Sequence, residues 1–404
     1  MATKTNTKAN VPNLRFPGFE GEWERKYLGD VAVIARGKSK HRPRDAALLY
    51  GGKYPFIQTG DVKSAGLYLD KYTQTYSDAG LKQSKLWDEN TLCITIAANI
   101  AETTILKIKA CFPDSIIGLI PYEKEASVLF IKHQFDKFKV DVQKLSQGIA
   151  QANLNQEKLS SIQFSFPSLI EQEKIATLLS LIDQRIETQN KIIEDLNIQM
   201  LGLQEKFFRQ KIKLKNKSGK QFPGWKYKNG VDLFDSISNK NHNSDLPILA
   251  ITQDYGAIPR DLIEYQITVT NKSIENYKVV EIGDFIISLR SFQGGIEYSN
   301  YNGICSPAYI ILRSKIEIVS DFYKYYFKTP YYIQMLNKKL EGIRDGKMIS
   351  YTYFSEISLP FPDLVEQKKI ADILSALEQK IEIENKIMKT YKAQKQYLLE
   401  SLFI

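Results

Sequence analysis

The sequence predicts an α+β fold that is built twice: two mixed α/β domains separated by two long helices, which we expect to form an antiparallel coiled coil. Three observations support this prediction. Residues 166–208 return without a gap at residues 361–403, with about 20 of 43 positions identical. Both copies open with Phe-Pro, which disfavours a helix, and then continue with helical periodicity. Shorter matches, such as Phe-Pro-Gly followed by Trp, extend the repeat into the preceding domains. The sequence therefore predicts an internal, pseudo-twofold duplication of a domain together with a helix.

Apolar residues alternate four and three positions apart along both repeated segments, and this seam persists for more than four heptads. Such a seam predicts a coiled coil. Gln189 and Glu384 interrupt it at equivalent positions, and we expect these two side chains to form a polar layer that fixes the register. Equivalent positions would also meet in a parallel pair. The alternative is two amphipathic helices, each packed on its own domain.

The chain divides into segments at the Phe-Pro pairs and at a basic linker. We expect a disordered leader at residues 1–11, a first domain at 12–165, a central helix at 166–208, the linker at 209–221, a second domain at 222–360 and a C-terminal helix at 361–404. Within the domains, β-rich runs occur at 92–96, 116–120, 285–289 and 309–312, and helical stretches at 128–144 and 320–340. The linker carries six basic residues and no acid, which fits either a solvated connection or a strap that contacts phosphates.

Composition is that of a globular protein with a basic excess. The net charge is +9 with 43% hydrophobic residues, and a basic balance favours a polyanionic partner. Three scattered cysteines lack metal-ligand spacing and fit a reducing, cytoplasmic setting. We find no apolar run of membrane-spanning length and no signal-peptide pattern, so no membrane association is expected.

Motifs of catalysis are missing from the sequence. There is no GxxxxGK[ST] phosphate loop, and the three histidines lie far from one another and from the cysteines. We therefore expect a chain that is not an enzyme and that binds neither a metal nor a cofactor.

Polar and basic side chains gather in loops at matching places of both domains. Arg, Lys, Asn and Gln are the side chains that contact phosphates and base edges. The first domain has a basic run that we expect to be a mobile strap, with a solvated loop as the alternative. The second domain has an amide-rich run at the matched position. The candidate DNA-binding residues are Arg36, Lys38, Lys40, Arg42, Arg44, Gln151, Asn153, Asn155, Asn239, Lys240, Asn241, Arg290, Gln293, Arg344, Lys347 and Tyr351.

The duplicated FPxL[IV]EQxKIAxxLS helices, the FPG…W starts, PFIQTGDV at residues 55–62 and SQGIAQANLNQEKLSSI before the first helix resemble the specificity (S) subunit of a Type I restriction-modification enzyme. This resemblance covers nearly the whole chain after the leader. It implies two target-recognition domains, each reading one half of a bipartite, asymmetric site in double-stranded DNA, and two conserved helices that hold the domains apart.

The resemblance also implies partners: two modification (M) subunits that bind S-adenosylmethionine and methylate adenine, and two restriction (R) subunits that use ATP and Mg²⁺. The apolar stripe on both helices is wider than a coiled-coil seam needs. We expect Leu178, Leu181, Ile192, Ile383 and Ile387 to contact the M subunits. The alternative function is a coiled-coil scaffold with non-specific nucleic-acid binding.

Overall fold

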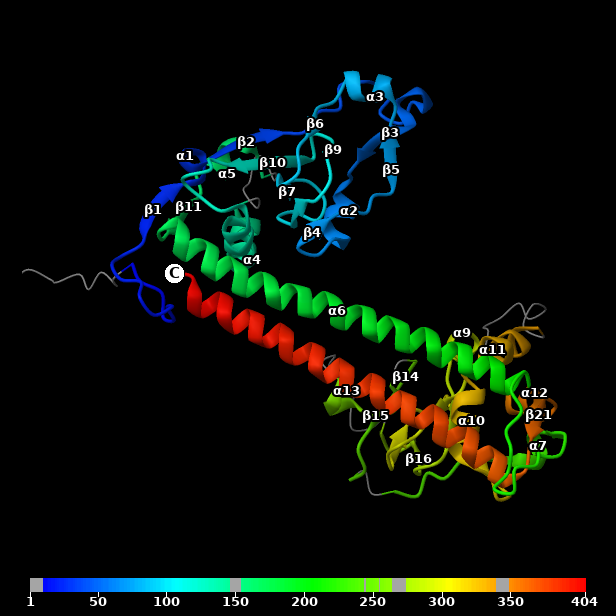
Figure 1. Ribbon diagram of the computed structural model, residues 1–404. Coiled ribbons are helices and arrows are strands. Elements are labelled where there is room, and N and C mark those ends of the chain that lie inside the picture. The colour runs from blue at the N-terminus through cyan, green and yellow to red at the C-terminus, as the bar shows by residue number, and fades with distance from the viewer. Residues whose placement is uncertain (1–9, 146–153, 243–244, 254, 264–273, 339–348) are drawn as a thin grey trace, which may run out of the picture. The chain divides into compact units, whose positions relative to one another are not determined.

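The computed structural model describes residues 10–145, 154–242, 245–253, 255–263, 274–338 and 349–404. The chain folds into two compact units. Unit 1 comprises residues up to Ile192 together with Glu384–Ile404, and unit 2 comprises Ile193–Ile383. Each unit therefore contains one mixed α/β domain and a part of both long helices (Figure 1). No helix in the described ranges is long and apolar enough to cross a membrane.

Unit 1 is organised on a five-stranded sheet of order β2-β10-β7-β8-β4, antiparallel except where β4 pairs with β8. The strands are β2 (Ala32–Arg36), β10 (Ile116–Pro121), β7 (Leu92–Thr95), β8 (Thr103–Leu106) and β4 (Tyr68–Leu69). A second sheet of order β5-β3-β9-β6 is formed by Gln74–Tyr76, Tyr50–Phe56, Ala110–Cys111 and Leu86–Trp87. β1 (Glu24–Tyr27) pairs with β11 (Gln163–Phe166). The helices are α1 (Leu28–Val31), the 3₁₀ turn η1 (Ala47–Leu49), α2 (Thr59–Ser64), α3 (Asp78–Lys82), α4 (Val128–Lys144) and α5 (Gln156–Ser160).

Unit 2 repeats this order in its main sheet, β13-β20-β17-β18, and in the pair β12-β21. These strands are Phe234–Ile237, Ile310–Ser314, Phe285–Ile287, Glu297–Tyr298, Lys226–Asn229 and Ser358–Phe361. Two further pairs are β14-β15 (Leu249–Thr252, Gly256–Pro259) and β16-β19 (Lys278–Val280, Gly303–Cys305). The helices are α7 (Gly230–Leu233), the 3₁₀ turn η2 (Arg260–Leu262), α9 (Ser291–Gly294), α10 (Ser320–Tyr326), α11 (Pro330–Asn337) and α12 (Tyr351–Ser355). The predicted duplication is confirmed.

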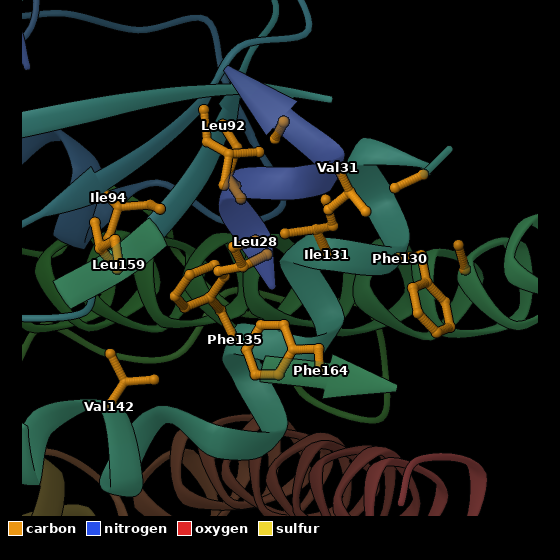
Figure 2. Close-up of a cluster of buried hydrophobic side chains, with 14 of the residues drawn as sticks. Leu28, Val31, Leu92, Ile94, Phe130, Ile131, Phe135, Val142, Leu159 and Phe164 are labelled. Carbon is orange, nitrogen blue, oxygen red and sulfur yellow. The ribbon is translucent and has the colours of Figure 1, made fainter. Parts of the chain in front are cut away.

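The core of unit 1 lies where α4 covers the main sheet. Side chains of α1, α4, β7, α5 and β11 meet there, and Figure 2 shows Leu28, Phe135 and Phe164 gathered at its centre. Phe130 and Phe135 are essentially unexposed, and each contributes roughly 1.5–3 kcal/mol by burial. The predicted helix 128–144 is confirmed. The predicted helix 320–340 is wrong in one respect: it is broken after α10, because Pro330 occupies the first turn of a new helix.

The two long helices are α6 (Leu169–Phe208) and α13 (Leu364–Leu402). Both begin directly after the Phe-Pro pair, at Ser168 and Asp363, whose side chains accept hydrogen bonds from the first turn. Every predicted seam position on either helix is buried or half-buried. The prediction of a coiled coil is confirmed.

The helices are antiparallel in each unit. In unit 1, Ile175 and Leu179 near the start of α6 share a core with Leu402 near the end of α13. Gln189 Nε2 donates to the Glu384 carboxylate (2.6 Å) and to the Glu384 carbonyl oxygen (3.1 Å). The predicted polar layer and the predicted orientation are both confirmed.

The last turn of α13 closes the core of unit 1. Phe403 is 2% exposed, and its ring centroid lies 5.1 Å from that of Phe130 of α4. Phe130 in turn lies 5.9 Å from Trp23, the tryptophan that precedes β1. The first domain is therefore completed by residues from the far end of the chain.

Unit 2 contains the same arrangement with the helices exchanged. Phe208, at the end of α6, lies 5.3 Å from Phe322 of α10, which lies 5.8 Å from Trp225. Phe208 and Phe403 occupy equivalent positions of the repeat. Each unit is thus closed by the end of the helix that starts on the other unit.

A buried glutamine near the start of each long helix holds the domain's own helix in place. Gln172 Oε1 accepts from the backbone N–H of Ser127 (3.0 Å), just before α4, and its amide donates to the carbonyl of the Phe-Pro proline (3.0 Å). Gln367 makes the same pair of bonds, accepting from Val319 just before α10 (3.0 Å). Both are at most 1% exposed, so losing either would leave buried backbone groups unpaired.

A buried charge network joins α4 to both long helices in unit 1. Lys395 Nζ of α13 lies 2.9 Å from Asp136 of α4 and 2.7 Å from Asp183 of α6. His133 Nδ1 lies 3.6 Å from Asp136 and 3.8 Å from Asp183. His133, Asp136 and Asp183 offer ligand atoms within 4.8 Å of one another. The ammonium groups of Lys395 and Lys132, which lies 2.5 Å from Asp136, already balance the two carboxylates.

This network predicts a pH dependence. Burial lowers the pKa of His133, and the neighbouring Lys395 lowers it further against the opposing pull of Asp136 and Asp183. The unfolded chain binds a proton near the ordinary histidine pKa of about 6.5, whereas the folded unit does so only at lower pH. The free energy of unfolding of unit 1 therefore decreases as pH falls below about 6.5, by at most ~1.4 kcal/mol per pH unit.

We expect hydrogen exchange of α4 to quicken between about pH 6.5 and pH 5 beyond the intrinsic pH effect. His133→Gln should flatten that dependence, because glutamine does not titrate. The depressed pKa of Asp136 and the raised pKa of Lys395 place their own effects outside this window. Equal pH dependence in the wild type and the variant would contradict the assignment.

Candidate nucleic-acid interface

Topology brings two loops of unit 1 to one edge of its main sheet. β2 and β7 both pair antiparallel with β10, so they run in the same direction and end at the same edge. Residues 37–46 leave this edge after β2 and residues 96–102 leave it after β7. Two strand spacings separate their starting points by about 10 Å.

Unit 2 has the same edge. β13 and β17 both pair antiparallel with β20, and the loops after them carry Asn239–Asn241 and Arg290–Gln293. Three groups of polar or basic residues, one in unit 1 and two in unit 2, thus lie at equivalent sheet edges. This arrangement is not visible in the spacing of the sequence.

The basic loop of unit 1 is fixed along its first part. The backbone N–H groups of Gly37 and Lys38 donate to the carbonyls of Ile116 (2.9 Å) and Phe112 (3.1 Å). A Cβ at Gly37 would come within 2.4 Å of the Phe112 carbonyl oxygen, so only glycine permits this approach. The start of the predicted strap is therefore anchored to unit 1, and the mobility of the rest stays a prediction.

The arginines of this loop are engaged within the unit. Arg36 Nε donates to the Asp114 carbonyl (3.0 Å), and Arg44 pairs with the Asp114 carboxylate at 2.9 Å. Arg42 donates to the carbonyls of Ser39 and His41, both at 2.8 Å. These contacts shape the loop. The side chains of Lys38 and Lys40 are exposed at its surface.

A lysine outside the predicted set adds to this positive surface. Lys85 Nζ lies 3.6 Å from the centre of the Trp87 ring. Partial burial lowers the pKa of Lys85, and the charge of Lys38 lowers it further, so the two lysines are close. The only sequence signal for Lys85 is its place two residues before a tryptophan.

In unit 2 the predicted loop residues Asn239, Lys240 and Asn241 are exposed, and the Asn239 side-chain oxygen accepts from the Asn241 N–H (2.9 Å). Arg290 and Gln293 are exposed on the neighbouring loop. Amide and basic side chains are thus presented together at this edge.

Two further cations of unit 2 were not predicted. Burial lowers the pKa of Lys278, with a smaller contribution from nearby Lys240. The charges of Arg260 and Arg290 both oppose the rise that burial causes in the pKa of Tyr309. Both arginines therefore lie near the Tyr309 hydroxyl. Within the described ranges, Nε and Nη1 of Arg260 are buried without a hydrogen-bond partner. A single arginine after a proline carries no sequence signal, so Arg260 could be found only from the fold.

Two predicted residues have structural contacts instead. Asn155 caps α5, its side-chain oxygen accepting from the Lys158 N–H (2.8 Å). Tyr351 packs on the core of unit 2 and donates its hydroxyl to the Phe234 carbonyl (2.9 Å). Gln151, Asn153, Arg344 and Lys347 lie outside the described residues, as do residues 1–9 of the predicted leader.

The long helices carry exposed apolar residues outside the seam. In unit 1, Ile170, Leu181 and Ile192 are 69%, 54% and 38% exposed. Their spacing of eleven residues is close to three helical turns, so they form one stripe along α6. In unit 2, Val365 and Ile383 of α13 are 51% and 55% exposed.

Of the remaining predicted partner contacts, Leu178 packs against the core of unit 1 and Ile387 is half-buried. Ile170 and Val365, at equivalent positions in the first turns of their helices, were not predicted.

Comparisons with known proteins agree with this arrangement. The family model of the Type I restriction modification DNA specificity domain matches residues 20–197 and again 224–391. A Methanocaldococcus jannaschii protein, described as a candidate specificity subunit of the type I restriction enzyme MjaX, is 27% identical over 278 residues. That match covers 64% of this chain and 62% of the relative.

The type I restriction enzyme MjaVIII specificity subunit of the same organism is 24% identical over 387 residues, which is 90% of this chain and 88% of the relative. The crystal structure of a type I restriction-modification system S subunit from M. genitalium shares the fold, with a TM-score of 0.63 and 16% identity, over 98% of this chain and 99% of that chain. Because the family model matches most of the chain, and matches it twice, this chain belongs to the family of Type I restriction-modification DNA specificity subunits.

Proposed function

We propose that this chain recognises a bipartite, non-palindromic site in double-stranded DNA, each unit reading one half. The observation that carries the proposal is the pair of equivalent sheet edges. Their strand order is the same, but one carries a basic loop at residues 36–44 and the other an amide-rich loop at 239–241. One scaffold with two different sets of side chains suits two different half-sites.

Electrostatics supports a polyanionic ligand. Lys38 and Lys85 lie close together in unit 1, as do Lys240 and Lys278 in unit 2, where Arg260 and Arg290 both lie near Tyr309. Clustering like charges costs free energy in the isolated protein, and DNA phosphates would relieve that cost. Amide and guanidinium groups beside them can then bond to base edges.

The exposed stripe on α6 supports docking of M subunits. Ile170, Leu181 and Ile192 present isolated aliphatic groups along one helix face, and Val365 and Ile383 do so on α13. Covering such residues is worth roughly 1.5–3 kcal/mol each. We assign two M subunits to these surfaces and two R subunits to the larger complex.

In this proposal the chain contributes recognition, and the chemistry belongs to its partners. S-adenosylmethionine would bind the M subunits, which methylate adenine, and ATP and Mg²⁺ would bind the R subunits. A reducing cytoplasm suits its three buried, free cysteines. A scaffold with non-specific nucleic-acid binding is less favoured, because it would not need differing loops at equivalent edges.

Exchanging one unit's domain tests the proposal. Replacing residues 222–360 by the corresponding segment of a relative should change only one half of the methylated site, because the other half is read by unit 1. Replacing residues 12–165 instead should change only the other half. Methylome sequencing of cells that carry the complex is the measurement. A single swap that altered both halves would contradict one unit reading one half-site.

The basic loop is assigned mainly to phosphates. Lys38→Gln and Lys40→Gln should each weaken binding to all DNA sequences alike, and each lost contact should reduce the slope of log K against log salt by about 0.9. Lys191→Gln, on α6 and paired with Glu187, is the matched control and should leave the slope unchanged. Loss of preference at one base pair with an unchanged slope would make these lysines base readers.

A further inference from the structure

The two units differ at one buried carboxylate. Glu171 and Glu366 occupy equivalent positions in the first turns of α6 and α13, and both are nearly inaccessible, at 1% and 6% exposure. In unit 1, Arg15 holds Glu171 with two parallel bonds, Nε to Oε1 at 2.8 Å and Nη2 to Oε2 at 2.9 Å. This is the bidentate geometry in which guanidinium binds carboxylate best.

Unit 2 has no arginine at the corresponding place. Arg15 precedes the Phe-Pro-Gly of the first domain, whereas Gln221 precedes that of the second. One hydrogen bond, from Trp225, reaches Glu366. Among the described residues, Glu366 Oε2 is buried without a hydrogen-bond partner.

Among the described residues, no cation contributes to the pKa shift of Glu366. Burial raises its pKa, the Trp225 bond opposes this, and the charge of Asp363 raises it further. The shift therefore includes repulsion from a second acid. A buried carboxylate without a counter-ion is costly, and an incoming cation would remove that cost.

A small cavity adjoins this carboxylate. It has a volume of about 50 Å³, and its lining is Glu366, two polar side chains, Lys213 and Gln210, and the apolar residues Ile212, Leu214, Phe222, Pro223, Gly224 and Trp225. The charge of Lys213 is not among the influences on the pKa of Glu366. At 10–15 Å³ for each water-sized group, it has room for roughly four heavy atoms, the number in a guanidinium group. The aromatic lining suits a flat cation, since guanidinium also binds aromatic faces.

We propose that this cavity is a receptor for an arginine side chain supplied by a protein that binds unit 2. The equivalent site identifies the ligand chemistry, because Glu171 already holds a guanidinium group. Since unit 1 fills its own site, this partner would bind once for each chain. The inference does not depend on the proposed DNA recognition.

Nuclear magnetic resonance of the full chain labelled with ¹⁵N at its tryptophan indoles tests the site. N-methylguanidinium, titrated at millimolar concentration and constant ionic strength, should shift the Trp225 indole resonance saturably. Methylammonium should do so more weakly. The Trp23 resonance serves as an internal control, because the equivalent site of unit 1 is occupied.

Two variants make the result decisive. Glu366→Gln should abolish the saturable shift. Gln221→Arg, which places an arginine in the register of Arg15, should also abolish it by filling the cavity from within, and should raise the denaturation midpoint of unit 2. That gain should disappear in the Glu366→Gln background. A wild-type chain without a saturable response, or a response unchanged in both variants, would overturn the proposal.

Discussion

Each unit depends on packing between its domain and the end of a helix that starts on the other unit. Phe403 of α13 seals the core beneath α4, and Phe208 of α6 does the same beneath α10. A Phe side chain removed from such a site costs about 3–5 kcal/mol, a large part of a domain's stability. Antiparallel pairing of α6 and α13 makes this packing possible, because it brings the end of each helix to the start of the other. Neither domain's core is complete without it.

This packing explains which features the two units share and which features differ between them. The seam, the glutamines at 172 and 367, and the Trp-Phe-Phe contacts recur in both units because they hold a domain on its helices. The loops at the sheet edges take no part in this packing, so their side chains can differ without disturbing the fold. This combination suits the proposed function: a constant frame that sets the geometry, and two surfaces proposed to read different bases.

Much of the frame could be predicted from the sequence, because its signals are periodic. The seam, its polar layer, the helix at 128–144 and the four strands followed from apolar spacing and repetition. The break at Pro330 was missed because aromatic residues continue the apolar pattern across it. The residues of the candidate nucleic-acid interface were harder to predict. Asn155 has the chemistry of both a base reader and a helix cap, and its cap became visible only through the bond from the Lys158 N–H. Arg260 and Lys85 are single cations whose position is set by tertiary packing.

Two single substitutions, measured by hydrogen exchange across the whole chain, test most directly whether each helix end completes the core of the unit where the other helix starts. Phe403→Ala should speed exchange in α4 and β11 of unit 1 and leave α10 and β21 of unit 2 protected. Phe208→Ala should do the reverse, although each residue belongs by sequence to the other copy of the repeat. If Phe403→Ala instead loosened the domain at residues 222–360, to which its helix belongs in sequence, the exchanged arrangement would be contradicted.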